Sequence, residues 1–142
     1  MSLRANCFFD GGSRGNPGLA GYAVVLTVET NPDNPIEVAR LLDRPATNNV
    51  AEYEGLCAGL RIALVRGVED IQMVSDSKLV VEQVLGTWAV KEPRLKILCA
   101  EAREMATRFS HSEIMHVPRE QNKQADKLVT DLLDEHSGRK RK

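Results

Sequence analysis

The sequence predicts an α/β domain with a five-stranded mixed sheet flanked by helices. Within residues 3–42, three short apolar segments are separated by turn-forming residues, which is typical of an antiparallel meander. From residue 48 onward, segments with helical spacing of apolar residues alternate with two short apolar segments, at residues 71–75 and 114–117. Because strand–helix–strand crossovers are right-handed, we expect the fourth strand to lie parallel to the first, on the side away from the meander.

The meander strands are expected at residues 3–9, 21–28 and 36–42. The first of them begins with alternating residues and becomes wholly apolar before it reaches Asp10, as in a strand covered on both faces. It is expected to end there and to pass into a glycine-rich loop over residues 11–18.

Four helices are expected to follow. In the first, apolar residues recur at helical spacing from Tyr53 to Leu64, and Asn48 or Asn49 is the expected N-cap. Asn122 is expected to cap the last helix. The other two are expected over residues 79–84 and 93–109. We assign residues 1–136 to one domain and residues 137–142 to a basic flexible tail.

Composition narrows the class of protein. The chain has 142 residues, of which 42% are hydrophobic, and this fits one folded domain. Its 19 Lys and Arg against 20 Asp and Glu give a net charge of −1, which argues against binding nucleic acid by bulk positive charge. Residues 1–6 do not show a basic segment followed by a long apolar one, so a secretory signal is not expected. No apolar run approaches the ~18 residues of a membrane span. The cysteines Cys7, Cys57 and Cys99 are expected to be buried free thiols in a reducing compartment. We therefore expect a cytoplasmic protein. We also expect a monomer.

Four carboxylates stand at positions that the predicted fold brings together. Asp10 and Asp76 end the first and fourth strands, and neighbouring strands lie about 4.8 Å apart. Glu52 and Asp126 each lie one turn before an apolar residue of a predicted helix, at the border of its apolar stripe. In open α/β sheets, binding sites lie at the carboxyl ends of the strands. They lie at the point where the chain leaves two neighbouring strands in opposite directions.

Each acidic residue alone has an ordinary explanation. Asp10 suits the start of a turn, Asp76 suits a helix cap, and acidic residues favour helix N-termini. A crowd of like charges is retained most readily when hard divalent cations neutralise it, and carboxylate oxygens suit Mg²⁺ or Mn²⁺. Two such ions can carry out phosphoryl transfer, one activating water and the other stabilising the leaving oxygen.

Four segments resemble the motifs of one enzyme family in order and spacing. They are residues 10–18 (Asp-Gly-Gly-Ser-Arg-Gly-Asn-Pro-Gly), 47–52 (Thr-Asn-Asn-Val-Ala-Glu), 76–78 (Asp-Ser-Lys) and 122–126 (Asn-Lys-Gln-Ala-Asp). On these motifs the sequence is identified as a member of the type 1 ribonuclease H family (ribonuclease HI). The resemblance implies a ribonuclease H-like fold with strand order 3-2-1-4-5. It also implies an endonuclease that cuts the RNA strand of RNA–DNA hybrids and leaves a 3′-hydroxyl and a 5′-phosphate.

The resemblance implies roles for the carboxylates and for the residues that bind nucleic acid. Asp10 is implied to bridge two Mg²⁺ ions, for which Mn²⁺ can substitute. Asp126 is implied to help hold the ion that activates water, and Glu52 and Asp76 the ion on the leaving-group side. Nucleic-acid contacts are implied at Gly11, Gly12, Asn16, Thr47, Asn48, Asn49 and Lys78.

These contact residues have distinct tasks in the family. Glycines leave room for the minor groove, where ribose 2′-hydroxyls distinguish RNA from DNA. Asn16, Asn48 and Asn49 match positions that contact this groove, although turn and cap formation also suits them. Thr47 matches a position that holds a DNA-strand phosphate, and Lys78 belongs to a modest basic patch.

The loop before Asp126 departs from the best-known bacterial pattern of the family. Residues 117–126 contain no histidine, which is similar to an archaeal-like subgroup, some members of which also cut RNA duplexes. Arg119 is the candidate to assist proton movement or phosphate release. It would act by positioning or electrostatics, because a guanidinium group does not give up its proton as a normal proton shuttle does. Trp88 is expected to pack in the core, with stacking near the DNA backbone as the alternative.

Two other functions stay open at this point. One is a non-catalytic module that binds hybrids or duplexes by shape, against which the crowded carboxylates argue because binding gains nothing from them. The other is a different nuclease of the same fold, such as a junction resolvase, against which residues 47–49 and the glycine-rich segment argue. Some relatives continue into a C-terminal phosphatase-like domain, so fusion to such a domain is a further expectation.

Overall fold

The computed structural model describes residues 3–137, so residues 138–142 of the expected tail lie outside it. Its five-stranded mixed sheet has the predicted order β3-β2-β1-β4-β5. The strands are β1 (Arg4–Gly15), β2 (Gly18–Val28), β3 (Ile36–Leu41), β4 (Asp70–Ser75) and β5 (His111–His116). The helices are α1 (Asn48–Val65), α2 (Lys78–Leu85), α3 (Pro93–Ala106) and α4 (Lys123–His136), with a 3₁₀ turn at Arg119–Gln121. β1 pairs antiparallel with β2 and parallel with β4, as the crossover rule predicts.

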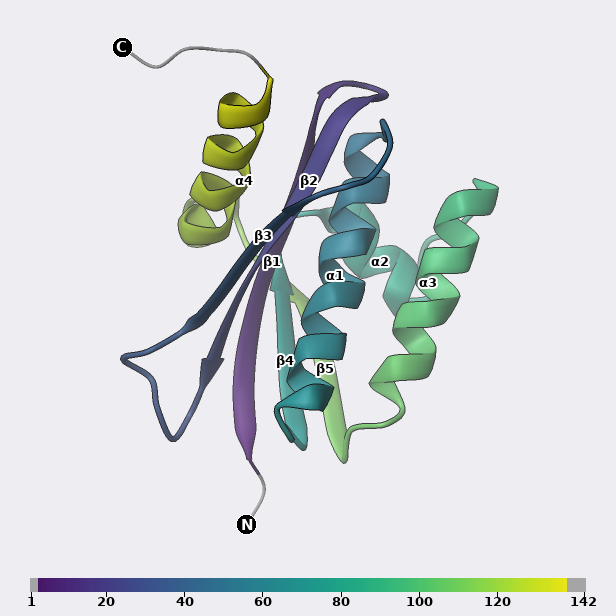
Figure 1. Cartoon of the computed structure of the whole chain (residues 1–142). Helices are drawn as coiled ribbons and strands as arrows, with labels where there is room; N and C mark the ends of the chain where they lie inside the picture. Colours follow the sequence, from purple (N-terminus) through teal and green to yellow (C-terminus); the bar gives the residue numbers. More distant parts are fainter. Residues whose placement is uncertain (1–2, 138–142) are drawn as a thin grey trace.

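Helices cover both faces of the sheet. Figure 1 shows α1, α2 and α3 on one face and α4 on the other. The main core lies between the sheet and α1, with Phe9 and Tyr53 fully buried in it. A smaller cluster, which includes Ala23, Val129 and Leu133, lies beneath α4. Strand β1 is therefore packed on both sides, and this places Asp10 in the interior of the molecule.

β1 is longer than the sequence predicts. The expected loop over residues 11–18 is wrong, because β1 continues through Asp10 as far as Gly15. Its glycine-rich half pairs with β2, from Gly11 opposite Tyr22 to Gly15 opposite Gly18. This antiparallel partner satisfies the backbone hydrogen bonds that a loop would leave to water. Gly15, with φ of 106°, makes the tight turn into β2, in a conformation that other residues rarely adopt.

The expected cap of α1 is wrong, and the expected cap of α4 is confirmed in its position but not in its hydrogen bond. The N-cap of α1 is Thr47, whose hydroxyl accepts a hydrogen bond from the Val50 N–H at 3.2 Å, in place of Asn48 or Asn49. Asn122 occupies the N-cap position of α4 but makes no capping bond with its side chain. Its amide instead donates to the Phe9 carbonyl oxygen in β1, at 2.9 Å.

Two further predictions need correction. β5 begins at His111 and ends at His116, a longer strand than the segment expected at residues 114–117, because it pairs with the whole of β4. Trp88 does not pack in the core, since 44% of it is exposed. The Lys78 ammonium lies 6.0 Å from the centre of the Trp88 ring, within the range of a cation–π contact.

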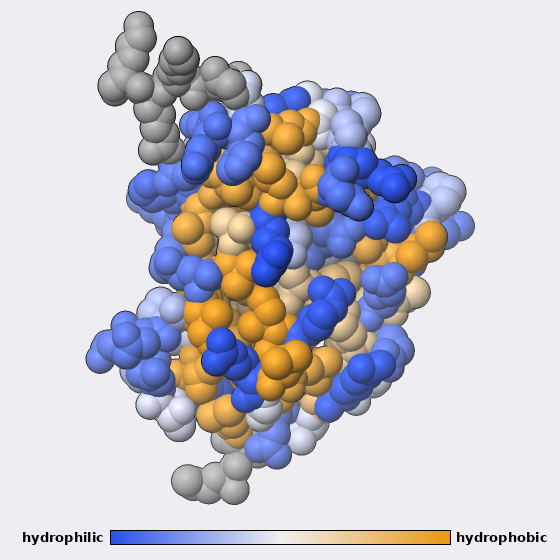
Figure 2. Space-filling view, in the orientation of Figure 1, coloured by the Kyte–Doolittle hydropathy of each residue, from blue (hydrophilic) through white to orange (hydrophobic). Residues whose placement is uncertain are grey.

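β5 forms one edge of the sheet and β3 forms the other. Figure 2 shows a band of apolar residues on the surface in front of the β3 edge, interrupted by charged side chains. Ile36, Val38 and Leu41 of β3 are half-buried, whereas Glu37 and Arg40 are exposed. Charges on an edge strand disfavour pairing with the strands of other molecules. Within residues 3–137, no helix combines the length and the apolar character needed to cross a membrane.

The three cysteines are buried free thiols, as predicted. Cys7 lies in β1, Cys57 in α1 and Cys99 in α3. Burial raises the pKa of Cys57 to about 12 and also raises the pKa of Cys7, because a thiolate is poorly solvated in the core.

Candidate active site

Three of the four predicted carboxylates meet at the carboxyl end of β4. Asp10 lies within β1, Asp76 directly follows β4, and Glu52 lies in the second turn of α1. One carboxylate oxygen from each lies within 4.8 Å of one from both of the others. The sequence predicted this meeting from the parallel pairing of β1 and β4, which holds from Arg4 to Phe8.

Gly11 allows α1 to approach β1 at this point. A Cβ atom on Gly11 would lie 2.4 Å from the Glu52 backbone nitrogen and 2.3 Å from the Ala51 carbonyl carbon. Real Cβ atoms do not come so close to backbone atoms, so only glycine fits here. Gly11 is itself buried, and its structural role is therefore to bring Glu52 beside Asp10. Gly12 similarly faces Val129 of α4, whose methyl group a Cβ would approach to 3.2 Å.

Burial and like charge act together on Asp10. Only 6% of this residue is exposed. Burial raises the pKa of Asp10 to about 8, with further increases from the negative charges of Asp76, Glu52 and Asp126, while a hydrogen bond from the Gly11 backbone opposes the rise. In the absence of a counter-ion, Asp10 therefore retains a proton up to mildly alkaline pH.

Glu52 experiences the same crowding. Burial raises the pKa of Glu52 to about 7, and Asp76 contributes a smaller rise. A hydrogen bond from the Ser77 side chain and the positive charge of Arg119 both oppose this rise. Ser77 also caps α2, its hydroxyl accepting from the Val80 N–H at 3.3 Å, so it joins the start of α2 to the carboxylate cluster.

Asp126 lies at the edge of this cluster. It is in the first turn of α4 and lines a cleft of about 360 Å³ together with Asp10, Glu52 and Arg119. Within the described residues, the group of oxygens that lie within 4.8 Å of one another does not include those of Asp126. The structure thus gathers three carboxylates closely and places the fourth on the wall of the same cleft.

Arg119 reaches the cleft from the 3₁₀ turn that precedes α4. Its Nε atom lies 3.7 Å from an Asp76 carboxylate oxygen, and 80% of its side chain is exposed. An exposed cation beside a cleft of carboxylates suits contact with an anion that enters from solvent. The sequence-based choice of Arg119 is therefore compatible with its position, and its role stays a prediction.

The predicted asparagines join the β1–β2 turn to the start of α1. The Asn16 Oδ1 accepts from the Asn48 N–H at 3.0 Å, and the Asn48 Oδ1 accepts from the Ser13 N–H at 2.8 Å. Their side-chain oxygens are thus engaged, while their amide N–H groups have no partner among the described residues. Asn49 and Thr47 flank Asn48 at the same helix end, and Lys78 lies apart from them at the start of α2. Contact of these residues with nucleic acid stays a prediction.

A family model described as reverse transcriptase-like matches residues 8–132, which include all four carboxylates. Among proteins, this chain is 42% identical to a ribonuclease HI of Halobacterium salinarum over 93% of this chain and 65% of that protein. The chain belongs to the type 1 ribonuclease H family. It is also 46% identical to a bifunctional protein of Mycobacterium tuberculosis, over 88% of this chain and 34% of that protein. This ribonuclease H chain thus spans about one third of the mycobacterial relative and about two thirds of the haloarchaeal one.

Solved ribonuclease H structures have the same fold. The N-terminal RNase H domain of the M. tuberculosis protein Rv2228c, solved as a fusion with maltose binding protein, is 42% identical, with a TM-score of 0.89 and coverage of 96% of this chain and 97% of that one. RNase H1 of H. salinarum is 40% identical, with a TM-score of 0.86 and coverage of 93% and 98%. LC11-RNase H1, solved in complex with an RNA/DNA hybrid, is 35% identical, with a TM-score of 0.84 and coverage of 94% and 99%.

The donor set of this ribonuclease H fits divalent metal ions. The ligand atoms of the cluster are all carboxylate oxygens, which hard cations such as Mg²⁺ and Mn²⁺ prefer. Burial and the neighbouring carboxylates raise the pKa values of Asp10 and Glu52, and the hydrogen bonds from Gly11 and Ser77 and the charge of Arg119 offset these rises only in part. A bound cation would offset the remainder, so we take this cluster as the candidate metal centre.

Sequence reasoning missed two residues that shape the site. Ser77 was not singled out, although a serine directly after a strand-ending aspartate is a common helix cap and was a usable signal. Apart from its place in the motif at residues 122–126, Asn122 was interpreted as a cap, since its partner Phe9 is 113 residues away and no local pattern reveals the bond.

Proposed function

We propose that this chain is an endonuclease that hydrolyses the RNA strand of RNA–DNA hybrids by two-metal-ion catalysis, leaving a 3′-hydroxyl and a 5′-phosphate. The observation that carries the proposal is the meeting of the Asp10, Glu52 and Asp76 oxygens within 4.8 Å, beside a cleft that Asp126 also lines. Family membership and the hybrid-bound relative support this choice of substrate.

The carboxylates would divide between two Mg²⁺ ions. Asp10, whose carboxylate is influenced by the charges of the other three acids, would help hold both ions; Asp126 would help hold one of them, and Glu52 and Asp76 the other. When bound, the ions supply an activated water and stabilise the departing oxygen of the phosphodiester. The burial of Asp10 and its hydrogen bond from Gly11 hold the shared carboxylate in one orientation before any ligand arrives.

The asparagines would select the strand to be cut. The side-chain oxygens of Asn16 and Asn48 hold backbone N–H groups, so their amide nitrogens are fixed in position and remain available as donors. Such donors suit ribose hydroxyls and base edges in the minor groove of a hybrid. Thr47 and Lys78 would hold the DNA strand by its phosphates, and we propose that Asn49, Gly11 and Gly12 border the same path.

Arg119 would act on the scissile phosphate or on the released one. Its guanidinium is exposed and close to Asp76, so it can pair with a phosphate oxygen without leaving the cleft. A proton-shuttle role does not suit it, because a guanidinium group keeps its proton at any pH at which the protein is folded.

The test is a cleavage assay with a panel of labelled substrates. The purified protein is incubated with an RNA–DNA hybrid, an RNA duplex, a DNA duplex and a four-way junction, each with Mg²⁺, Mn²⁺ or EDTA. We expect cleavage of the RNA strand of the hybrid with either metal and none with EDTA. The RNA-duplex sample decides whether the activity extends to that substrate. Cleavage of the junction alone would contradict the proposal and would favour a resolvase.

The control is Asp10→Asn, which removes the shared charge but keeps the size of the side chain. This variant is expected to fold and to bind the hybrid without cutting it. Metal-dependent cleavage by Asp10→Asn at the wild-type rate would contradict the assignment. Binding of the hybrid by the wild-type protein without cleavage in either metal would instead indicate a non-catalytic module.

A further inference from the structure

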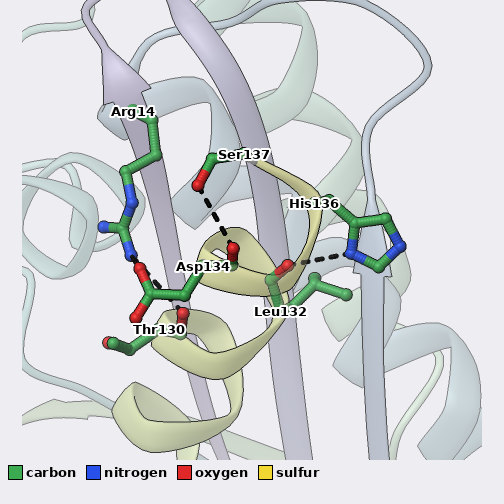
Figure 3. A network of polar contacts seen from close by, with 6 residues as sticks. All are labelled: Arg14, Thr130, Leu132, Asp134, His136 and Ser137. Carbon is green, nitrogen blue, oxygen red and sulfur yellow. Dashed lines mark hydrogen bonds and ion pairs between the residues drawn. The ribbon is translucent and has the colours of Figure 1, made fainter. Parts of the chain in front are cut away.

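Helix α4 is tied to strand β1 by polar contacts on both sides of Asp126. Before Asp126, the Asn122 Nδ2 donates to the Phe9 carbonyl oxygen at 2.9 Å. After it, the Arg14 guanidinium donates to the Asp134 carboxylate and, at 3.4 Å, to the Thr130 carbonyl oxygen. Figure 3 shows this second tie, with Arg14 reaching from β1 to the last turns of α4.

The two ties are separated by matching lengths of strand and helix. Phe9 and Arg14 are five residues apart in β1, which is about 17 Å of extended chain. Asn122 and Asp134 are twelve residues apart, which is about 18 Å of helix. A shift of α4 along β1 by one helical turn would therefore break both ties at once.

Packing between the ties sets how close α4 comes but not where it stands along β1. A Cβ on Gly12 would meet the side chains of Val129 at 3.2 Å and Leu133 at 3.4 Å, so the glycine lets α4 lie close to the strand. Apolar contacts are non-directional and tolerate sliding. Hydrogen bonds have preferred distances and angles, so the ties at Asn122 and Arg14 fix the position along the strand.

We propose that Asn122 and the Arg14–Asp134 pair are positioning residues that set the separation of the Asp10 and Asp126 carboxylates. Asn122 holds the carbonyl group that directly precedes Asp10, and its own carbonyl oxygen accepts from the Asp126 N–H at 3.1 Å. This inference rests on the proposed metal centre. The affinity for the ion that Asp10 and Asp126 share then depends on Asn122 and on the Arg14–Asp134 pair, although these residues do not touch the ion.

The local structure explains why an asparagine is useful at this place. Pairing between β1 and β4 ends at Phe8 and Val74, so the next β1 carbonyl needs another donor, and Asn122 supplies it. Asn122 is 1% exposed, and its Oδ1 has no hydrogen-bond partner among the described residues. A buried unpaired acceptor disfavours folding. The residue is therefore better explained by the placement of Asp126 than by stability alone.

The test measures Mn²⁺ binding to the free protein by the electron paramagnetic resonance signal of the unbound ion. We expect Asn122→Ala to weaken Mn²⁺ binding by about tenfold. This is the usual loss of metal affinity when a residue that holds a metal ligand in place is removed. In an Asp126→Asn background, the same change is expected to alter the affinity by less than about twofold, because the ligand it positions is gone. Arg14→Gln, which leaves the core intact, is expected to act in the same direction and replaces Asn122→Ala if that variant does not fold.

Leu128→Ala is the matched control, since Leu128 lies on α4, packs against the apolar cluster beneath this helix and makes no polar contact with β1. It is expected to lower the melting temperature with little effect on Mn²⁺ affinity. Wild-type Mn²⁺ affinity in Asn122→Ala, an equal loss in Leu128→Ala, or an undiminished effect in the Asp126→Asn background would each overturn the inference. Absence of Asp10-dependent Mn²⁺ binding in the wild-type protein would instead overturn the proposed metal centre.

Discussion

Gly11 and Glu52 lie so close together that a Cβ on the glycine would be 2.4 Å from the glutamate's backbone nitrogen. The contact joins the strand that carries Asp10 to the helix that carries Glu52. Two of the candidate metal ligands therefore owe their proximity to the absence of one side chain.

Gly11→Ala is expected to displace α1 and move Glu52 away from Asp10. The atoms in the way are backbone atoms, so relief requires a shift of the helix and costs about 1–3 kcal/mol of stability. Misplacement of a catalytic group by about 1 Å lowers a rate by about 100-fold. Urea unfolding and single-turnover cleavage of a hybrid measure the two effects. Gly12→Ala, which meets only movable side chains, is expected to lose less in both, and equal losses would contradict this explanation.

The metal-free protein is expected to lose stability as pH rises from about 4 to about 8. Asp10 has a pKa of about 8 in the folded protein, against an ordinary value near 4 in the unfolded chain. Between these values the folded state retains a proton that the unfolded state has released, so rising pH favours unfolding until the folded-state pKa is passed. Urea unfolding in EDTA at pH 5 and pH 8 measures the difference.

Asp10→Asn is expected to stabilise the metal-free protein at pH 8 by about 1–3 kcal/mol, because it removes the buried charge. Mg²⁺ is expected to stabilise the wild-type protein at this pH and to have a much smaller effect on the variant. A variant that is less stable than the wild type in EDTA at pH 8 would show that the Asp10 charge is already compensated within the protein.

Arg119→Ala is expected to slow cleavage by about tenfold or more while hybrid binding is retained. The reason is that the variant lacks a group that stabilises the charge developing in the transition state. Since the Arg119 charge lowers the pKa of Glu52, its removal also shifts the acidic limb of the pH–rate profile to higher pH. Arg119→Lys should recover part of both effects. Arg108→Ala, which alters a surface pair with Glu104 on α3, is the control and should leave both unchanged.

Lys78→Ala is expected to weaken hybrid binding and to reduce the slope of log affinity against log salt by about 1, the signature of one lost phosphate contact. The Lys78 ammonium lies over the Trp88 ring, so Trp88→Leu is expected to weaken binding with less change in slope. Filter binding in Ca²⁺ over a range of salt concentrations measures both. A wild-type slope in Lys78→Ala would exclude a phosphate contact at this residue.

The parallel pairing of β1 with β4 and the meeting of Asp10, Glu52 and Asp76 could be predicted because they follow from local patterns and one handedness rule. The place of β5 in the strand order was predicted only from the resemblance to the family. The length of β1 could not, because glycines near Asn16 and Pro17 usually indicate a loop, and only pairing with β2 shows that they are in a strand. Strand pairing is a long-range property that no local pattern of residues contains.

The role of Asn122 escaped prediction for a related reason. Its position before a helix has a local explanation as a cap, whereas its observed bond spans 113 residues. Trp88 was placed in the core on its residue type alone, but its ring stands beside Lys78 at the surface. In both cases the local expectation was reasonable, and a contact between distant parts of the chain decided the outcome.

The three buried cysteines provide native reporters of opening motions. Thiol reagents attack the thiolate, and burial raises the pKa of Cys57 to about 12, so labelling requires exposure of the sulfur to solvent. Cys7, Cys57 and Cys99 belong to a strand and two different helices of one core. Equal labelling rates at the three sites would mean that the core opens as a unit, whereas faster labelling of Cys99 would mean that α3 detaches first. The unmodified protein can thus be used to time its own local unfolding.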